Sequence, residues 1–273
     1  MSKARAQIRK PLDSLAQVTI AVVDTRGVPL GLVRSPDAPV FGIDVSLQKA
    51  RTAAFMSNAN AAAQLLADPS ADVRSFVPAT RTFLADPAAL TGRTAFSARA
   101  VGNLARPYFP DGELARPSGP LSRPIAKWSV FSTGLQTALV LTNLAQHLNF
   151  VTGASLVDTP ARCSFIPDAA PTQNRLQNGV QIFPGAVPIY RGTTLVGAIG
   201  VSGDGIDQDD MIAFLGLSNA ASILGTLGNA PAASRADTLV FDLGSGASTR
   251  LRYVSCPFAP FVASAAQNVC QGL

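Results

Sequence analysis

The strongest constraint on the fold is a pattern that occurs twice, a β hairpin followed at once by a helix. Residues 18–34 contain the alternating β-branched run TIAVVD, a turn ending at Gly27 and a returning strand. Residues 187–201 repeat the pattern with VPIY, a turn and LVGAIGV. Each hairpin offers a face that a helix can cover. The sequence therefore predicts an α+β fold, in which helices flank an antiparallel sheet.

The helix after the first hairpin, within FGIDVSLQKARTAAF, has one apolar face rich in small side chains. Its members recur at spacings of four, three and four: Ile43, Leu47, Ala50 and Ala54. Small residues let a helix lie close to a sheet. Asp44 is expected to cap the start of this helix, and Lys49 and Arg51 to lie on its other sides.

Residues 58–156 form a long segment between the two hairpin units and are interpreted as an insertion in a single domain of residues 1–273. Short helices are expected near 59–67, 78–85 and 95–104. Five prolines between residues 106 and 124 predict an arm, a lid or a loop packed on a partner. An amphipathic helix is expected over residues 132–150. Residues 229–273 are interpreted as a C-terminal extension with one more strand pair, in DTLVFDL and TRLRYVSC.

The composition argues against a membrane-spanning protein and against a nucleic-acid-binding protein. With 47% hydrophobic residues and no uninterrupted apolar run of membrane-spanning length, the chain is expected to be a soluble protein without a membrane partner. The net charge of +5 is scattered and not interleaved with aromatic residues, which favours a solvated basic surface over a nucleic-acid interface.

Three cysteines, Cys163, Cys256 and Cys270, leave several pairings open. Cys256 could bond to Cys270, Cys163 could bond to either, or all three could be buried free thiols. The chain has no CxxC motif and no cluster of Cys and His, so no zinc site is predicted. The start, MSKARAQIRKPL, lacks the apolar region of a signal peptide.

The stretch LVGAIGVSGDGIDQDD, residues 195–210, could be a phosphate loop, a calcium loop or a corner between a strand and a helix. Its glycines lack GxGxxG spacing, and three acids at the helix start would repel phosphate. The calcium-loop alternation is also missing. A corner is therefore predicted, with Asp207 as helix cap and Asp209 and Asp210 stabilising the helix start. Ser202 does not complete a GxSxG elbow, and no catalytic residue is assigned.

Two motifs resemble the GlcG/HbpS-like haem-binding family, which includes the C-terminal domain of PduO-type proteins. The first is IAVVD-x-x-G followed by an R-x-D-A-P-like turn at residues 34–39 and the KARTA helix at 49–53. The second is VGAIGVSG at residues 196–203, with Gly185 and Pro188 before it and Gln208, Asp209 and Ala213 after it. The sequence departs from the family in its leading helix, for which only residues 2–9 remain, in a glycine pair replaced around Gly185, and in the longer segment 58–156.

The resemblance implies a profilin-like or roadblock-like fold in a bacterial protein that forms homo-oligomers. It also implies haem or a related tetrapyrrole as ligand, with a role in redox sensing or weak haem degradation. Enzymatic activity is not expected from the residues themselves. The alternative is an assembly module that kept the fold and lost the ligand. A periplasmic location is expected if the N-terminus is truncated and the cysteines pair, and a cytoplasmic one otherwise.

The expected cofactor-binding residues divide into three kinds. Cations could pair with haem propionates, glycine and proline belong to the family motif, and the single histidine is the first candidate for an axial ligand. These residues are Lys49, Arg51, Arg34, Gly185, Pro188 and His147. For the three cations, ordinary salt bridges to Asp24, Asp37 or Asp44 are the alternative.

Overall fold

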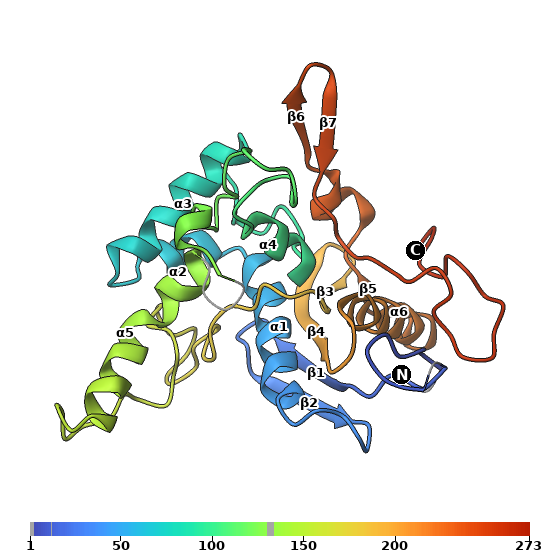
Figure 1. The fold of residues 1–273 in the computed structure, drawn as a ribbon, viewed down its shortest axis with the longest axis horizontal. Helices are drawn as coiled ribbons and strands as arrows, with labels where there is room; N and C mark the ends of the chain where they lie inside the picture. Colours follow the sequence, from blue (N-terminus) through green and yellow to red (C-terminus); the bar gives the residue numbers. More distant parts are fainter. Residues whose placement is uncertain (1–2, 12, 130–133) are drawn as a thin grey trace.

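The computed structural model describes residues 3–11, 13–129 and 134–273. Its centre is a five-stranded antiparallel sheet in the order β2-β1-β4-β3-β5 (Figure 1). The strands are β1 (Thr19–Asp24), β2 (Pro29–Arg34), β3 (Ala186–Arg191), β4 (Thr194–Ser202) and β5 (Gly228–Asn229). The two predicted hairpins are thus β1–β2 and β3–β4. They meet where β1 pairs with β4, so they share one sheet as expected.

Two long helices cover opposite faces of this sheet, namely α1 (Gly42–Met56) and α6 (Ile206–Leu224). Small side chains of β3 and β4, Ala186 and Ala198, pack with the alanines of α1. Their neighbours Val187 and Val201 point the other way and join the core with α6. This alternation is the strand period of two. A Cβ on Gly200 would lie 2.1 Å from the Ser46 carbonyl oxygen, so this glycine sets how closely α1 approaches.

The predicted helix caps are wrong, although the helices themselves are confirmed. The residues at the N-caps are Phe41 for α1 and Gly205 for α6, and neither makes a side-chain capping bond. Asp44 and Asp207 lie inside the first turn instead, because both helices begin earlier than predicted. An acid in the first turn still interacts favourably with the helix dipole.

The segment between the hairpins contains α2 (Ala61–Leu66), α3 (Ala71–Phe83), α4 (Ala98–Leu104), the 3-10 turn η1 (Ile125–Lys127) and α5 (Gly134–Val151). The predicted start of a helix at Pro78 is wrong, since α3 runs through that proline. Its buried stripe, Val73, Phe76, Val77 and Thr80, offsets the lost backbone bond. Helix α5 confirms the prediction for 132–150, except that residues 132 and 133 lie outside the described ranges.

The C-terminal part returns over this region. After the 3-10 turns η2 (Ala232–Ser234) and η3 (Ala236–Thr238), strands β6 (Val240–Gly244) and β7 (Ala247–Arg250) form the predicted strand pair, which projects from the molecule (Figure 1). Phe241 packs against Phe83 and Phe109, and Arg116 donates to the Leu243 carbonyl. The proline-rich arm is therefore fastened to the β6–β7 hairpin.

The N-terminal segment from residue 3 lies beside part of the C-terminal extension (Figure 1). Ala4 forms a β bridge with Phe261, and the Arg5 amide donates to the Pro260 carbonyl. Among the pairings left open, the structure has Cys256 bonded to Cys270 and Cys163 as a free thiol. No helix within the described ranges is long and apolar enough to span a membrane.

Candidate functional site

Lys49 and Asp209 form a buried ion pair at the centre of the family motif. Lys49 Nζ lies 2.8 Å from Asp209 Oδ2 and donates to the Val201 carbonyl at 2.8 Å. The side chains are 3% and 2% exposed. Burial raises the pKa of Asp209 to about 6, even though Lys49 acts in the opposite direction.

Gly185 is the position that leaves room for this pair. Its φ is +125°, and a Cβ there would lie 2.8 Å from Lys49 Nζ and 2.6 Å from the Val201 carbonyl oxygen. Both the backbone angle and the space therefore require glycine. Of the predicted site residues, Lys49 and Gly185 are the ones that the fold brings into contact.

A second charged cluster lies alongside, around Arg99 of α4. Its guanidinium bonds to Asp210 through Nε and to Asp207 through Nη2. Burial raises the pKa of Asp210. The predicted corner between strand and helix is confirmed at residues 203–205, and Asp207 and Asp209 lie in the first turn of α6 as acids of the helix start. The sequence did not predict a second role, since Asp209 and Asp210 are also buried partners of cations on other helices.

The other predicted cations are also used within the protein. Arg51 donates to the Gly27 carbonyl and to Asn178 Oδ1, at 2.8 and 2.7 Å, and burial lowers the pKa of its guanidinium. Arg34 donates to the Ala38 carbonyl. Pro188 lies buried in β3 opposite Ala198. Pairing of Lys49 or Arg51 with propionates stays a prediction, and it would require these internal bonds to open.

His147 stands apart from those residues, on α5. Its Nδ1 lies 2.8 Å from Asp158 Oδ1, and its side chain is 51% exposed. The hydrogen bond with His147 lowers the pKa of Asp158. A carboxylate on one imidazole nitrogen fixes the ring and directs the other nitrogen outward, the arrangement that supports a histidine bound to a metal. Asp158 is thus a site residue that sequence reasoning missed.

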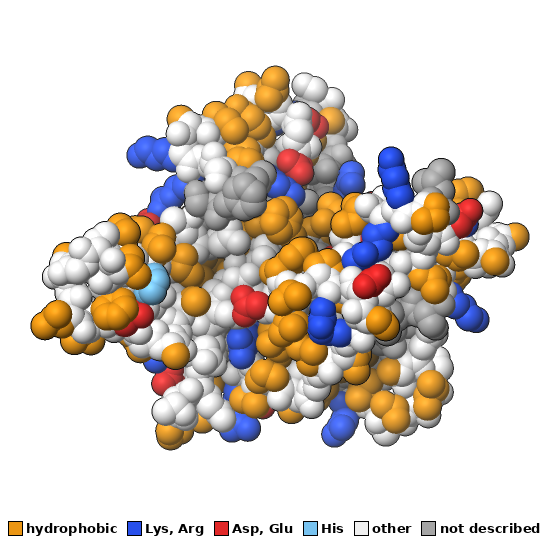
Figure 2. All heavy atoms as spheres, turned by 60° about the horizontal axis from the view of Figure 1, so that its bottom comes forward, with side chains coloured by type: hydrophobic (Ala, Val, Ile, Leu, Met, Phe, Trp, Pro, Cys, Tyr) orange, Lys and Arg blue, Asp and Glu red, His pale blue; other side chains and the backbone are white. Residues whose placement is uncertain are grey.

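An exposed apolar stripe runs along α5 and is bordered by His147. Its members recur at spacings of three and four, and each is more than half exposed: Leu141, Leu144, Leu148 and Val151. Figure 2 shows the histidine among hydrophobic side chains at the left end of the molecule. We call these four residues the α5 stripe. Toward the start of the helix, Leu141 and Thr137 line a hollow with Lys127 and Arg123.

Comparison with known proteins identifies one family. The model of a family described as "Haem degrading protein HbpS-like" matches residues 1–100 and 126–218. A Klebsiella pneumoniae protein ORFY structure, of the family DUF336, is 16% identical, with a TM-score of 0.32, over 72% of this chain and 70% of that one. A PduOC:Heme complex is 16% identical, with a TM-score of 0.31, over 79% and 83%. No curated protein matches the chain.

Helix α5 and the 3-10 turn η1 before it together carry the kinds of group that a haem would need. A haem needs an apolar surface for its ring, a ligand for its iron and cations for its propionates. The α5 stripe offers the surface, and His147 Nε2 offers the ligand. Lys127 is exposed and forms no ion pair with any described residue, whereas Arg123 pairs with Asp72.

Proposed function

Because the chain belongs to the HbpS-like family of haem-degrading proteins, we propose that it binds haem, or a related tetrapyrrole, on the exposed face of α5. The observation that carries this proposal is the His147–Asp158 pair beside the α5 stripe. His147 is the only histidine of the chain, and the fold leaves its Nε2 outside the hydrogen bond. The residues of the α5 stripe are more than half exposed and do not belong to the hydrophobic core of the described residues.

Each residue of the proposed haem site has a separate role in binding. Asp158 accepts the Nδ1 proton and so keeps His147 in the tautomer whose Nε2 can bind a metal. Leu144, Leu148 and Val151 exclude water from one face of a planar ring. Lys127 stands near the other end of the stripe, where it can pair with a carboxylate. When bound, haem supplies redox-active iron, and we propose redox sensing or weak haem degradation as its use.

A haemin titration tests this proposal. Wild-type protein should give a saturable, red-shifted Soret band. His147→Ala should abolish the shift. It should also weaken binding roughly tenfold or more, which corresponds to a loss of about 1.4 kcal/mol or more of binding free energy. Leu144→Ser with Leu148→Ser should weaken binding without removing the histidine spectrum.

The matched control is Ile223→Ser with Leu224→Ser, at the end of α6, where both side chains are similarly exposed. These changes should leave the titration unchanged. If His147→Ala gives the wild-type spectrum and affinity, haem does not use α5. Loss of the Soret band on adding a reductant in the presence of O2, but not under anaerobic conditions, with His147 intact, would support degradation over simple binding.

A second candidate is an assembly module, and the edge strand β2 favours it. All six residues of β2 are exposed, including Leu30, Leu32 and Val33, and Val40 and Phe41, which follow β2 in the sequence, are exposed as well. An exposed apolar edge strand is a template for pairing with another chain. We propose that copies of the chain associate through β2. Light scattering should show an oligomer that Val33→Lys dissociates, and a monomeric wild type would end this candidate.

A further inference from the structure

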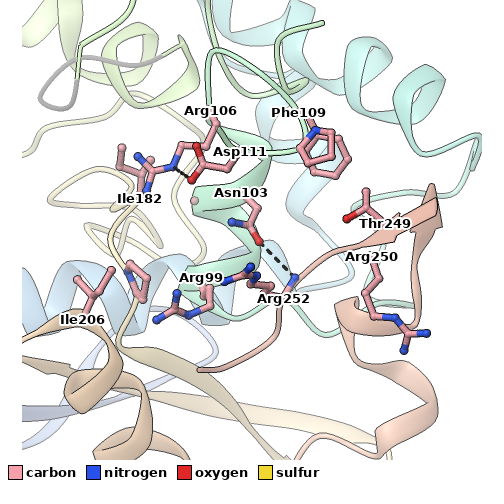
Figure 3. A pocket seen from close by; sticks show the side chains of 13 residues that line it. Arg99, Asn103, Arg106, Phe109, Asp111, Ile182, Ile206, Thr249, Arg250 and Arg252 are labelled. Atoms are coloured by element: carbon pink, nitrogen blue, oxygen red, sulfur yellow. Dashed lines mark hydrogen bonds and ion pairs between the residues drawn. The ribbon is translucent and has the colours of Figure 1, made fainter. Parts of the chain in front are cut away.

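A cavity of about 330 Å³ lies between α4 and the end of β7 with the residues that follow it (Figure 3). Arg99 and Asn103 of α4 and Arg106 just beyond it line the cavity, as do Arg250 at the end of β7 and Arg252, which lies next to Asn103. Most of this wall belongs to residues 101–125 and 219–273, the two stretches that the family model does not match. The cavity is therefore a feature of this chain and is separate from the α5 stripe.

The charges around the cavity are unbalanced. Four arginines line it, against one aspartate, Asp111. Arg99 is neutralised by Asp207 and Asp210, and Arg106 Nε lies 3.4 Å from Asp111 without a hydrogen bond to any described residue.

Arg250 and Arg252 have no acidic partner in the described part of the chain, and both are exposed. Two guanidinium groups without an acidic partner thus line the same cavity as a third, weakly paired one, and an anion bound there would supply the negative charge that the lining lacks.

Part of the lining of the cavity is apolar. Phe109, Ile182, Pro184 and Ile206 line the same cavity. Asn103 adds a side-chain amide, whose oxygen accepts from the Arg252 backbone N–H. A bare inorganic anion would use the guanidinium groups and leave the apolar part of the lining empty. A ligand with a short carbon skeleton between its charged groups would use both.

We propose that this cavity binds a small organic dianion, whose carboxylate or phosphate groups pair with Arg106, Arg250 and Arg252. The volume is near the lower end of that of small-molecule sites, which fits a ligand of this size. No histidine, cysteine, methionine or tyrosine is among its described lining residues, so it offers no iron ligand of the usual kinds and differs in chemistry from the proposed haem site.

Isothermal titration calorimetry on the full chain tests the proposal with four probes: glutarate, phosphoglycolate, butyrate and sulfate. Saturable binding is expected for glutarate, a dianion, or for phosphoglycolate, whose phosphate group contributes a charge of about −1.5 to −2 near pH 7 in addition to its carboxylate. Butyrate, with one charge, and sulfate, with no skeleton, should each bind at least roughly tenfold more weakly, because each lacks one set of contacts.

The variant Arg250→Ala with Arg252→Ala should weaken dianion binding by roughly tenfold or more. The matched control is Arg93→Ala with Arg191→Ala, two exposed arginines outside the cavity, which removes the same net charge. Urea unfolding of both variants checks that the fold persists. Absence of saturable binding by either organic dianion, equal weakening by the control, or equally tight sulfate binding would overturn the proposal.

Discussion

Replacing Lys49 with methionine tests whether the ammonium group sustains the buried charge of Asp209, 2.8 Å away. Methionine has a similar length and no charge, so it removes the ion pair and the hydrogen bond to the Val201 carbonyl with little change in volume. The loss of stability depends on the ionisation state that Asp209 adopts once Lys49 is removed. The carboxyl can stay charged in an apolar site, or it can take up a proton.

The pKa of Asp209 sets the size of that cost. Burial raises it from 3.8 to about 6. Because the folded-state pKa is the higher one, this carboxyl stabilises the fold fully below about pH 4, and the contribution is lost as the pH rises through 6. Ionised Asp209 therefore destabilises the wild-type protein at pH 7.5 by about 3 kcal/mol, at about 1.36 kcal/mol per pKa unit.

Without Lys49, Asp209 limits its cost by becoming protonated. Protonating Asp209 at pH 7.5 costs about 5 kcal/mol, because its pKa in the unfolded chain is 3.8. The ionised carboxylate of the wild type costs about 3 kcal/mol, so the variant loses about 2 kcal/mol more. The carbonyl of Val201 also loses its donor, for about 1 kcal/mol. Lys49→Met should thus lower the free energy of unfolding by about 3 kcal/mol at pH 7.5.

At pH 5 the same variant should lose only about 1 kcal/mol, because Asp209 is then already protonated in the wild type. Urea unfolding followed by circular dichroism at the two pH values measures both losses. The control is Arg26→Met, since Arg26 is half exposed and 3.4 Å from Asp24, and its loss should stay below about 1 kcal/mol. Equal losses for Lys49→Met at both pH values would refute the reasoning.

Two further predictions concern Gly185 and Asp158. Gly185→Ala should destabilise the protein by more than about 2 kcal/mol in urea unfolding, because it adds a clash with the Val201 carbonyl to a positive φ. Gly192→Ala, with φ of +59° and open space around it, should cost only about 1 kcal/mol, and equal costs would contradict the role given to Gly185. His147→Ala should raise the pKa of Asp158 toward its ordinary value, since the hydrogen bond from the histidine is the largest of the causes that lower it. Carbon NMR titration of the Asp158 carboxyl measures this, and an unchanged low pKa would show that His147 is not its cause.

The elements that local pattern could predict are those whose own residues decide their packing. The hairpins 18–34 and 187–201 alternate with strand period, and the structure places both in one sheet. The small face of α1 carries Ala50 and Ala54, and both are buried against the sheet. At Pro78 the rule that proline begins a helix conflicted with the apolar spacing of the surrounding residues. The helix α3 follows the apolar spacing, because its buried stripe continues through the proline.

The pairing of buried charges could not be predicted, because the partners are far apart in sequence. Lys49 meets Asp209 across 160 positions, and Arg99 meets Asp210 across 111. In the sequence, Asp209 and Asp210 look like ordinary acids at a helix start, and Arg99 has no motif around it. Only the close approach of α1 and α4 to the start of α6 makes these residues partners. Asp158 was missed for a different reason: it lies only 11 positions from His147, but nothing in its loop points to the pairing.

This distribution of charge has a consequence for ligands. Three cations inside the family-matched ranges, Lys49, Arg51 and Arg99, are buried, and each is already bonded to protein carboxylates, amides or carbonyls. An anionic ligand that engaged them would first have to displace those partners in a site of low dielectric, where unpaired charges are costly. Arg250 and Arg252 require no such exchange, and they lie beyond the matched ranges. Anion recognition by this chain is therefore expected to depend on its own C-terminal segment more than on the motif that defines its family.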